Sequence, residues 1–219
     1  GTTNLLICVD NEGIVIDEPS ILTIDAQTKK CIAAGKEAKE MLGRTPRSMI
    51  CISPLKDGVI ADFEATEMLL NYFFKECNLR GMFRKNMILI CHPTNITTVA
   101  IRDCAYRAGA KKVYLEEEPK VAAVGAGLDI GKACGSMVLD IGGGTSDIAV
   151  LALGDIVCST SLKVAGNRFT QLIIDYLRKE RKLAIGEQMA EEVKIRIGSA
   201  LPMDEPLTME VSGLAMESG

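Results

Sequence analysis

Over the first fifty residues, apolar and polar positions alternate in short runs that are separated by turn-forming residues. Alternation with a period of two predicts half-buried β-strands, and the Asp, Asn and Gly within residues 10–13 predict a turn between the first two. The expected strands are residues 4–9, 14–16, 20–24 and 31–34. Their succession predicts an antiparallel meander.

The spacing of apolar positions changes after residue 48. Residues 49–52 form an apolar run that predicts a strand, and residues 61–77 carry apolar side chains at helical spacing. Strands are then expected at 87–91 and 112–115, and helices at 97–108 and 119–125, the last opening at Pro119. Parallel strands need crossover connections and cover on both faces, so the pattern predicts an α/β fold with helices packed on a mixed sheet.

The strand pattern restarts near residue 136. Strands are expected at 136–140, 146–153 and 155–164, followed by helices at 166–181 and 186–198. A second group of strands followed by helices indicates an internal structural repeat. The cleft between two such units is the natural place for a ligand.

Composition narrows the class of protein. The chain has 219 residues, 47% of them hydrophobic, which is enough for a buried core. Its formal charge of -4 lacks the basic excess that attracts nucleic acid, so no nucleic acid partner is expected.

No apolar stretch approaches the ~20 residues of a membrane-spanning helix and no signal peptide opens the chain, so we expect a cytoplasmic protein. A start at Gly1 without Met, and an end rich in small residues, lead us to expect a piece of a longer protein.

The eight cysteines form no CxxC pair, and most lie in apolar runs. This distribution favours buried free thiols in a reducing compartment, with metal binding through cysteine as the alternative. His92 is the one histidine, and it has no Cys or His at ligand spacing, so a metal site around it is not expected.

A glycine-rich turn follows the strand at 136–140. It consists of Asp140, Ile141, Gly142, Gly143, Gly144 and Thr145. Three glycines allow backbone N–H groups to approach phosphate oxygens. Asp140 is placed to hold Mg²⁺ through water, and the Thr145 hydroxyl can reach a phosphate or the attacking water. The alternative is an ordinary hairpin that needs flexible residues in its turn.

A second candidate loop precedes the first strand, and it comprises Gly1, Thr2, Thr3 and Asn4. It occupies the place in the first structural unit that the glycine-rich turn occupies in the second. Two such loops would clamp one phosphate chain from opposite sides.

Two further sets of charged residues are candidate functional residues. Glu118, fixed at a helix start by Pro119, could orient or deprotonate a hydrolytic water, although acidic residues at a helix start are also favoured by the helix dipole. Glu191 and Lys194 lie three positions apart and therefore share a helix face. They form either an exposed ion pair or contacts to a ribose and base.

In combination, these features resemble the actin-like ATPases, the superfamily of actin, Hsp70 chaperones and bacterial MreB. Within it, residues 35–46 and 54–67 are similar to MreB and its Mbl paralogues. The similarity continues through residues 117–119, 140–145, 165–166 and 190–198. The resemblance therefore extends over essentially the whole chain.

The resemblance implies an actin-like, ribonuclease H-like fold in which two mixed-sheet units flank a nucleotide cleft. Residues 1–135 would form the first domain, with a small inserted subdomain near 20–55, and residues 136–219 the start of the second. It further implies a slow ATPase that polymerises into membrane-associated filaments and determines rod shape by organising cell-wall synthesis. The expected partners are other copies of the chain, the inner face of the cell membrane, and membrane proteins of cell shape and cell-wall synthesis.

The resemblance also assigns site residues. ATP phosphates and Mg²⁺ would be bound by the loop at residues 1–4 and the hairpin at 140–145. Glu118 and Thr145 would serve hydrolysis. The remaining nucleotide contacts would come from Gly166, Asn167, Glu191 and Lys194, the last two at the adenosine.

In MreB relatives a short apolar loop inserts into the bilayer, and the matching segment here is residues 78–85. Met82 and Phe83 would enter the membrane, and Arg80, Arg84 and Lys85 would face anionic headgroups. The alternative is a loop whose apolar tip folds back onto the domain.

Several residues depart from the family pattern. An acidic residue expected two positions before the first Gly-Thr is absent, and residues 91–95 replace a Val-Pro-x-Gly type of turn. Asn167 and Thr170 stand where relatives usually carry aspartates. The last two differences keep open the hypothesis of a catalytically weak actin-like scaffold. A third hypothesis is an Hsp70-like or sugar-kinase-like ATPase of the same superfamily, and residues 35–46 and 54–67 argue against it.

Overall fold

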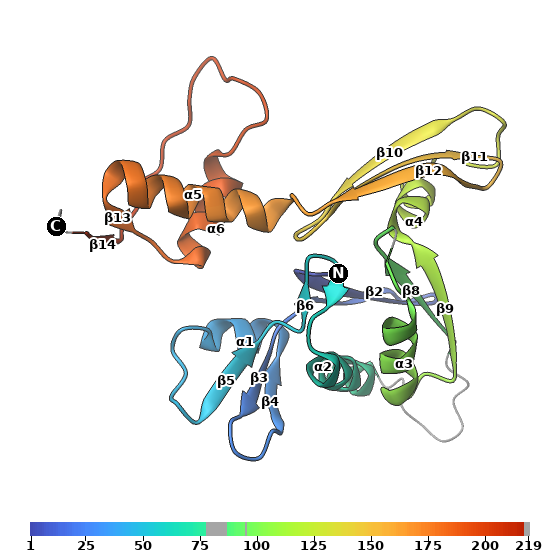
Figure 1. Cartoon of the computed structure of the whole chain (residues 1–219), viewed down its shortest axis with the longest axis horizontal. Helices are drawn as coiled ribbons and strands as arrows, with labels where there is room; N and C mark the ends of the chain where they lie inside the picture. The colour runs from blue at the N-terminus through green and yellow to red at the C-terminus, as the bar shows by residue number, and fades with distance from the viewer. Residues whose placement is uncertain (78–86, 95, 217–219) are drawn as a thin grey trace. The chain divides into compact units, whose positions relative to one another are not determined.

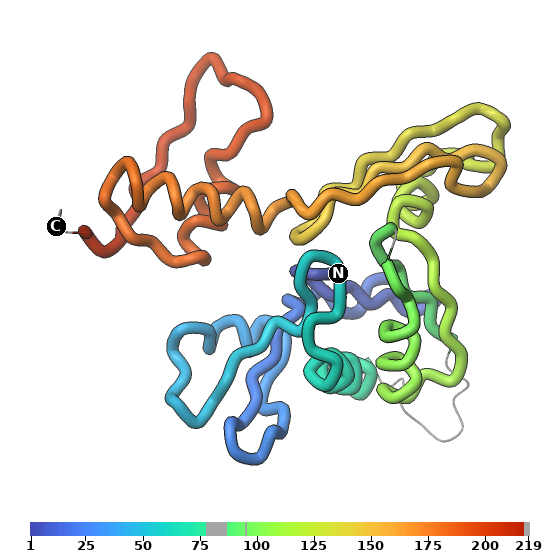
Figure 2. Tube along the Cα trace, in the orientation of Figure 1, coloured from blue at the N-terminus to red at the C-terminus, as the bar shows by residue number. Residues whose placement is uncertain are grey.

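The computed structural model describes residues 1–77, 87–94 and 96–216. The expected membrane-contacting residues Arg80, Met82, Phe83, Arg84 and Lys85 lie outside this set. The chain forms two compact units, Gly1–Lys163 and Val164–Gly219, which are described separately (Figures 1 and 2). Among the described residues, no helix has the length and apolar character needed to cross a membrane.

The N-terminal strands form two separate antiparallel sheets. β1 (Asn4–Val9) pairs with β2 (Gly13–Pro19). β3 (Leu22–Asp25) lies between β4 (Cys31–Ala34) and β5 (Met49–Ile52). The predicted strands are therefore present, but the prediction of one continuous meander is wrong. β2 ends at Pro19, which has no N–H to continue a ladder, and the chain turns before β3.

A helix and a short hairpin were not predicted. α1 (Gly35–Met41) buries Ala38 against Ile21 and Ala33. β6 (Leu55–Lys56) and β7 (Val59–Ile60) form a hairpin. Its turn residues, Asp57 and Gly58, have φ angles of 49° and 77°. This turn becomes important at the candidate site.

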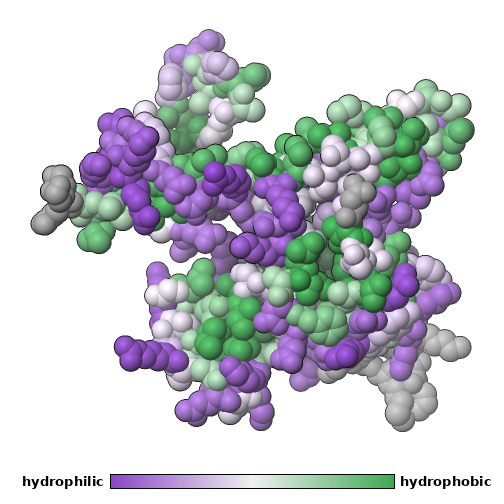
Figure 3. All heavy atoms as spheres, in the orientation of Figure 1, coloured by the Kyte–Doolittle hydropathy of each residue, from purple (hydrophilic) through white to green (hydrophobic). Residues whose placement is uncertain are grey.

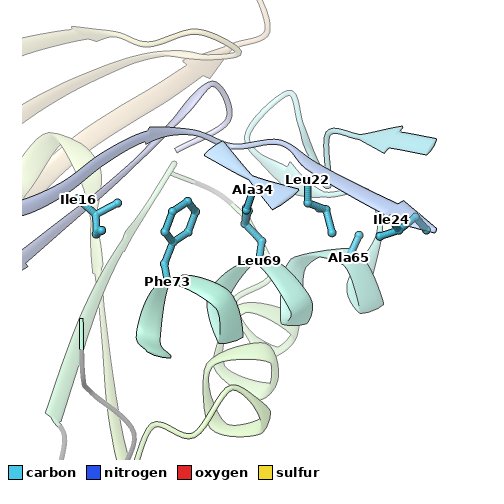
Figure 4. Close-up of a cluster of buried hydrophobic side chains, with 7 residues drawn as sticks. All are labelled: Ile16, Leu22, Ile24, Ala34, Ala65, Leu69 and Phe73. Carbon is cyan, nitrogen blue, oxygen red and sulfur yellow. The ribbon is translucent and has the colours of Figure 1, made fainter. Parts of the chain in front are cut away.

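The long helix α2 (Phe63–Glu76) follows the predicted pattern closely. Its N-cap Asp62 accepts a hydrogen bond of 2.9 Å from the Ala65 backbone N–H, which satisfies one of the unpaired N–H groups of the first turn. Its apolar stripe meets strands β2, β3 and β4 in the core cluster of Figure 4, formed by Ile16, Leu22, Ile24, Ala34, Ala65, Leu69 and Phe73.

A parallel crossover completes the middle of the first unit. β8 (Met87–His92) and β9 (Lys112–Glu117) pair in parallel and are connected through α3 (Val99–Arg107). Figure 2 follows this path along the chain. The parallel pair forms its own two-stranded sheet, so the prediction of a single mixed sheet is wrong. Alternation of apolar residues locates strands but does not identify their partners.

The last sheet of the first unit is antiparallel, in the order β10 (Ser136–Ile141), β11 (Ser146–Ala152) and β12 (Asp155–Leu162). α4 (Glu118–Gly125) covers one face by packing Ala123 against Ala149 and Leu151. On β10, three apolar side chains stay exposed: Met137 (68%), Leu139 (54%) and Ile141 (55%). Apolar surface is visible over this sheet in Figure 3. α4 packs on this sheet, and the compact unit continues past residue 135. The expected domain boundary between residues 135 and 136 stays a prediction.

The second unit contains two helices and a small hairpin. α5 (Gly166–Arg181) has the predicted bounds and ends at Lys182, whose φ of 51° breaks the helix. α6 (Glu187–Ile197) packs against it. β13 (Leu183–Ala184) pairs with β14 (Leu214–Ala215).

All eight cysteines are free thiols. The expectation of burial is met fully only by Cys104, and it is wrong for the exposed Cys8, Cys91, Cys134 and Cys158. Cys8 and Cys91 lie in strands with alternating burial and occupy the more exposed face. An apolar run in a strand therefore did not imply burial on both faces.

Candidate functional site

The glycine-rich turn is a tight hairpin between β10 and β11. The Gly142 N–H donates to the Thr145 carbonyl oxygen at 2.8 Å and closes the turn. Thr145 is buried. Gly144 is required by contact: a Cβ at this position would lie 2.9 Å from Cγ2 of Thr2. The two loops predicted to clamp a phosphate chain are therefore in direct contact within the first unit.

The turn of the β6–β7 hairpin joins these two loops. The Gly58 N–H donates to Oγ1 of Thr2 at 3.0 Å. A Cβ on Gly58 would lie 2.8 Å from both Cγ2 of Thr145 and Cγ of Pro93, and its φ of +77° also favours glycine. Sequence reasoning missed Gly58, although an Asp-Gly dipeptide is a strong hairpin signal.

The N-terminal loop is held by the beginning of the next sheet. The Ser20 hydroxyl donates to the Gly1 carbonyl at 2.7 Å, and the Ser20 N–H donates to the Thr3 carbonyl at 2.7 Å. The Asn4 side chain donates to Oδ1 of Asp17 at 3.3 Å, in the β1–β2 ladder. Thr2 is thus the member of the predicted loop that contacts the glycine-rich turn.

Three carboxyl groups come within electrostatic range at this place. Burial raises the pKa of Glu118, which stands at the start of α4. Asp140 and Asp147 raise it further, and His92 lowers it. Burial and then Asp147 also raise the pKa of Asp140, which lies opposite Asp147 in the β10–β11 ladder. Like charges this close favour a bound cation or proton.

The donor chemistry fits Mg²⁺ held jointly with a phosphate. Within the described part of the chain, no group of three His, Cys, Asp or Glu side chains could hold a metal ion. Mg²⁺ usually keeps several waters and takes one or two carboxylates together with substrate phosphates. Asp140 could supply such a carboxylate at the mouth of the hairpin.

Asp147 is a buried site residue that sequence reasoning missed. It accepts hydrogen bonds from the Thr94 N–H at 3.1 Å and from the Thr94 hydroxyl at 3.2 Å. Both residues are 1% exposed. The preceding His92 is also buried, and its Nδ1 donates to the Pro93 carbonyl at 2.8 Å. The only sequence signal for Asp147 was its place two residues after Thr145.

A cavity of about 520 Å³ adjoins the hairpin. Pro93, Thr94 and Thr145 line it, together with Ala100 of α3 and Thr160 of β12. The cavity lies wholly within the first unit.

The remaining predicted residues lie in the second unit. Lys194 Nζ donates to Oε2 of Glu191 at 2.7 Å and to the Gly166 carbonyl and Thr170 hydroxyl oxygens at 3.1 Å each. The Thr170 hydroxyl is also 2.5 Å from Oε2 of Glu191. The pair therefore ties α6 to the first turn of α5, where Asn167 is exposed. An ion pair is present, and a nucleotide contact by the same residues stays a prediction.

Comparison with known proteins places the chain among cell-shape proteins. Residues 1–219 match the family model described as MreB/Mbl protein. The chain is 52% identical to the cell shape-determining protein Mbl of Bacillus cereus, over 100% of this chain and 67% of that protein. It is 47% identical to the cell shape-determining protein MreB of Escherichia coli, over 100% of this chain and 65% of that protein. The chain thus spans about two thirds of the length of these relatives.

Solved structures agree with the sequence comparison. The chain superposes with a TM-score of 0.90 on MreB 5 of Spiroplasma citri bound to AMPPNP, at 40% identity over 99% of this chain and 66% of that one. It matches the MamK double helical filament with a TM-score of 0.73 at 21% identity, over 90% of this chain and 62% of that one, which shows the fold alone. The predicted α/β, actin-like fold class is confirmed, and the chain belongs to the MreB/Mbl family.

Proposed function

We propose that this chain is the larger part of an ATP-binding, slowly ATP-hydrolysing filament protein that determines cell shape. The observation that carries the proposal is the meeting of Thr2, Gly58 and Gly144 beside the carboxyl groups of Glu118 and Asp140. Tight glycine turns next to acidic residues are suited to a phosphate chain with its cation. The AMPPNP-bound and ADP-bound structures of MreB 5 of Spiroplasma citri add support.

In this proposal the first unit handles the phosphates. The loop at residues 1–4 and the hairpin residues Gly142, Gly143 and Gly144 offer backbone N–H groups to phosphate oxygens. Asp140 would hold Mg²⁺, and the bound ion would neutralise charge on the phosphates. In the second unit, Gly166, Asn167, Glu191 and Lys194 contact the rest of the nucleotide.

Glu118 and Thr145 serve hydrolysis. Burial raises the pKa of Glu118, which brings a carboxylate closer to the proton affinity that a general base needs near neutral pH. The Thr145 hydroxyl orients the attacking water or a phosphate oxygen. Once the water has given its proton to Glu118, the hydroxide oxygen attacks the terminal phosphorus and the diphosphate leaves.

The proposed role in the cell is inferred from the relatives. Relatives named as cell shape-determining proteins, and the filament formed by MamK, support self-assembly into filaments. We place these filaments in the cytoplasm at the inner face of the cell membrane, where they would organise membrane proteins of cell-wall synthesis. Residues 80–85 would provide the membrane contact.

A second candidate is a catalytically weak scaffold of the same fold. It is favoured by Asn167 and Thr170, which replace acidic residues expected at the start of α5, and by the use of Lys194 in an internal network. An Hsp70-like or sugar-kinase-like activity is not proposed, because the whole chain matches the MreB/Mbl model.

The test is Glu118→Gln in the full-length protein that contains this chain, with Glu117→Gln as the matched control. Loss of the base should lower the rate of phosphate release roughly 10²–10⁴-fold, while nucleotide binding measured by calorimetry is preserved. Glu117 is the N-cap of α4 without a side-chain capping bond, so its variant should hydrolyse normally. Equal rates for both variants and wild type would remove Glu118 from the mechanism, and a wild type that binds but never hydrolyses would favour the scaffold.

A further inference from the structure

One buried hydrogen-bonded pair ties the segment between β8 and α3 to the glycine-rich hairpin. The Thr94 N–H and hydroxyl both donate to Oδ1 of Asp147, across 53 positions of sequence. Both residues are 1% exposed, so water does not compete for these bonds. A carboxylate that accepts two buried hydrogen bonds is a strong local anchor.

The fold alone does not favour a carboxylate at residue 147. Burying a charge is costly, and Asp147 also faces Asp140 across the β10–β11 ladder, where like charges repel. An apolar residue would pack in the same place without either cost. The arrangement therefore has to be explained by what Asp147 holds in position.

The site residue nearest to Asp147 along the chain is Thr145. Thr145 directly precedes β11, and Asp147 is the second residue of that strand. The methyl group of Thr145 packs against Gly58, which also contacts Pro93, the neighbour of Thr94. The His92–Pro93 hydrogen bond further restrains this segment. Thr145 thus lies between the β6–β7 turn and the segment that Asp147 anchors.

We propose that Asp147 and Thr94 are positioning residues for Thr145, whose hydroxyl they keep in the orientation that serves hydrolysis. This inference rests on the proposed function, and it adds two residues that act through Thr145. The backbone N–H groups of the hairpin are untouched by the pair. The anchor therefore governs the rate of hydrolysis and leaves nucleotide affinity unchanged.

The experiment compares variants that differ by single groups in the full-length protein. Thr94→Val keeps the shape but removes the hydroxyl donor, whereas Thr94→Ser retains it. Thr94→Val should lower kcat roughly 10–100-fold through misplacement of Thr145, with unchanged nucleotide affinity. Thr94→Ser should stay near wild type.

A second measurement does not depend on hydrolysis. In the 219-residue chain, NMR relaxation of the Thr145 methyl group should show greater mobility in Thr94→Val than in wild type or Thr94→Ser. If Thr94→Val does not fold, Thr94→Ala takes its place. Unchanged Thr145 mobility in the folded variant overturns the proposal, and so does a Thr94→Ser enzyme as slow as Thr94→Val. A mobile Thr145 in a protein that never hydrolyses ATP would instead refute the proposed function and leave the anchor standing.

Discussion

Small residues determine how closely the two candidate phosphate loops approach each other. Gly144 and Gly58 each leave room that a methyl group would fill, next to Thr2 in one case and next to Thr145 and Pro93 in the other. Gly142 and Gly144 do not have φ angles in the left-handed region, so the close approach, and not an unusual backbone, explains Gly144.

We expect Gly144→Ala to destabilise the first unit by about 1–3 kcal/mol, because the new methyl group overlaps the Thr2 side chain. Urea unfolding of the 219-residue chain measures this change. Gly125→Ala is the control, since a Cβ there meets nothing within 4 Å; it should stabilise the chain by about 0.4–1 kcal/mol. Adding Thr2→Ser to Gly144→Ala removes the crowded Cγ2 and should recover part of the loss. No recovery would show that the Thr2 contact is not the cause.

At the scale of elements, the first unit depends on the face that α2 presents to the sheets. Leu69 and Phe73 are each 1% exposed and pack with Leu22 and Ala34. Figure 4 shows these side chains directed from the helix toward the strands.

Leu69→Ala should lower the free energy of unfolding of the chain by about 2–5 kcal/mol, because it leaves a cavity in this cluster. Chemical denaturation followed by circular dichroism provides the measurement. Lys75→Ala, on the exposed side of the same helix, should change stability by less than about 0.5 kcal/mol. Similar losses for both variants would mean that helix propensity, and not packing, sets the stability of α2.

Elements with a long periodic pattern were predictable from sequence, and short or irregular ones were not. β5 and α5 have the predicted bounds, since Met49–Ile52 is a clear apolar run and Gly166–Arg181 is strongly amphipathic. α1 was missed because it begins at a glycine with a φ of 66° and has no side-chain cap. Two-residue strands such as β6 and β7 are too short to show a period.

Some residues of the candidate site were likewise predictable from sequence, and others were not. Residues within a contiguous motif, such as Gly144 and Thr145, were identified because glycine and acidic residues stood together in sequence. Gly58, Thr94 and Asp147 were missed, because their roles depend on contacts between segments far apart along the chain. The pairing of β3 with β5 was missed for the same reason, since alternation does not reveal which strand lies beside which.

At the scale of the whole molecule, the proposed membrane contact depends on assembly. Burying Met82 and Phe83 would contribute ~1.5–3 kcal/mol each, and each neighbouring cation ~1 kcal/mol at an anionic surface. One subunit would therefore bind weakly, and a filament that presents many such loops would bind through avidity.

The full-length protein with Met82→Ser and Phe83→Ser should lose its nucleotide-dependent co-sedimentation with anionic liposomes. The loss would follow from removal of the inserted apolar groups while all three cations remain. Neutral liposomes and light scattering without lipid serve as controls, the second showing that polymerisation is intact. Undiminished sedimentation of the variant would refute the membrane contact.

The single histidine gives the first unit its own spectroscopic label. His92 lies in the restrained segment beside Pro93 and Thr94, and its imidazole donates from Nδ1 to the Pro93 carbonyl. Because the chain has one imidazole, its ¹H and ¹⁵N resonances need no assignment by mutagenesis. A neutral ring should carry its hydrogen on Nδ1, and its signals would report directly whether adding nucleotide disturbs the segment that Asp147 anchors.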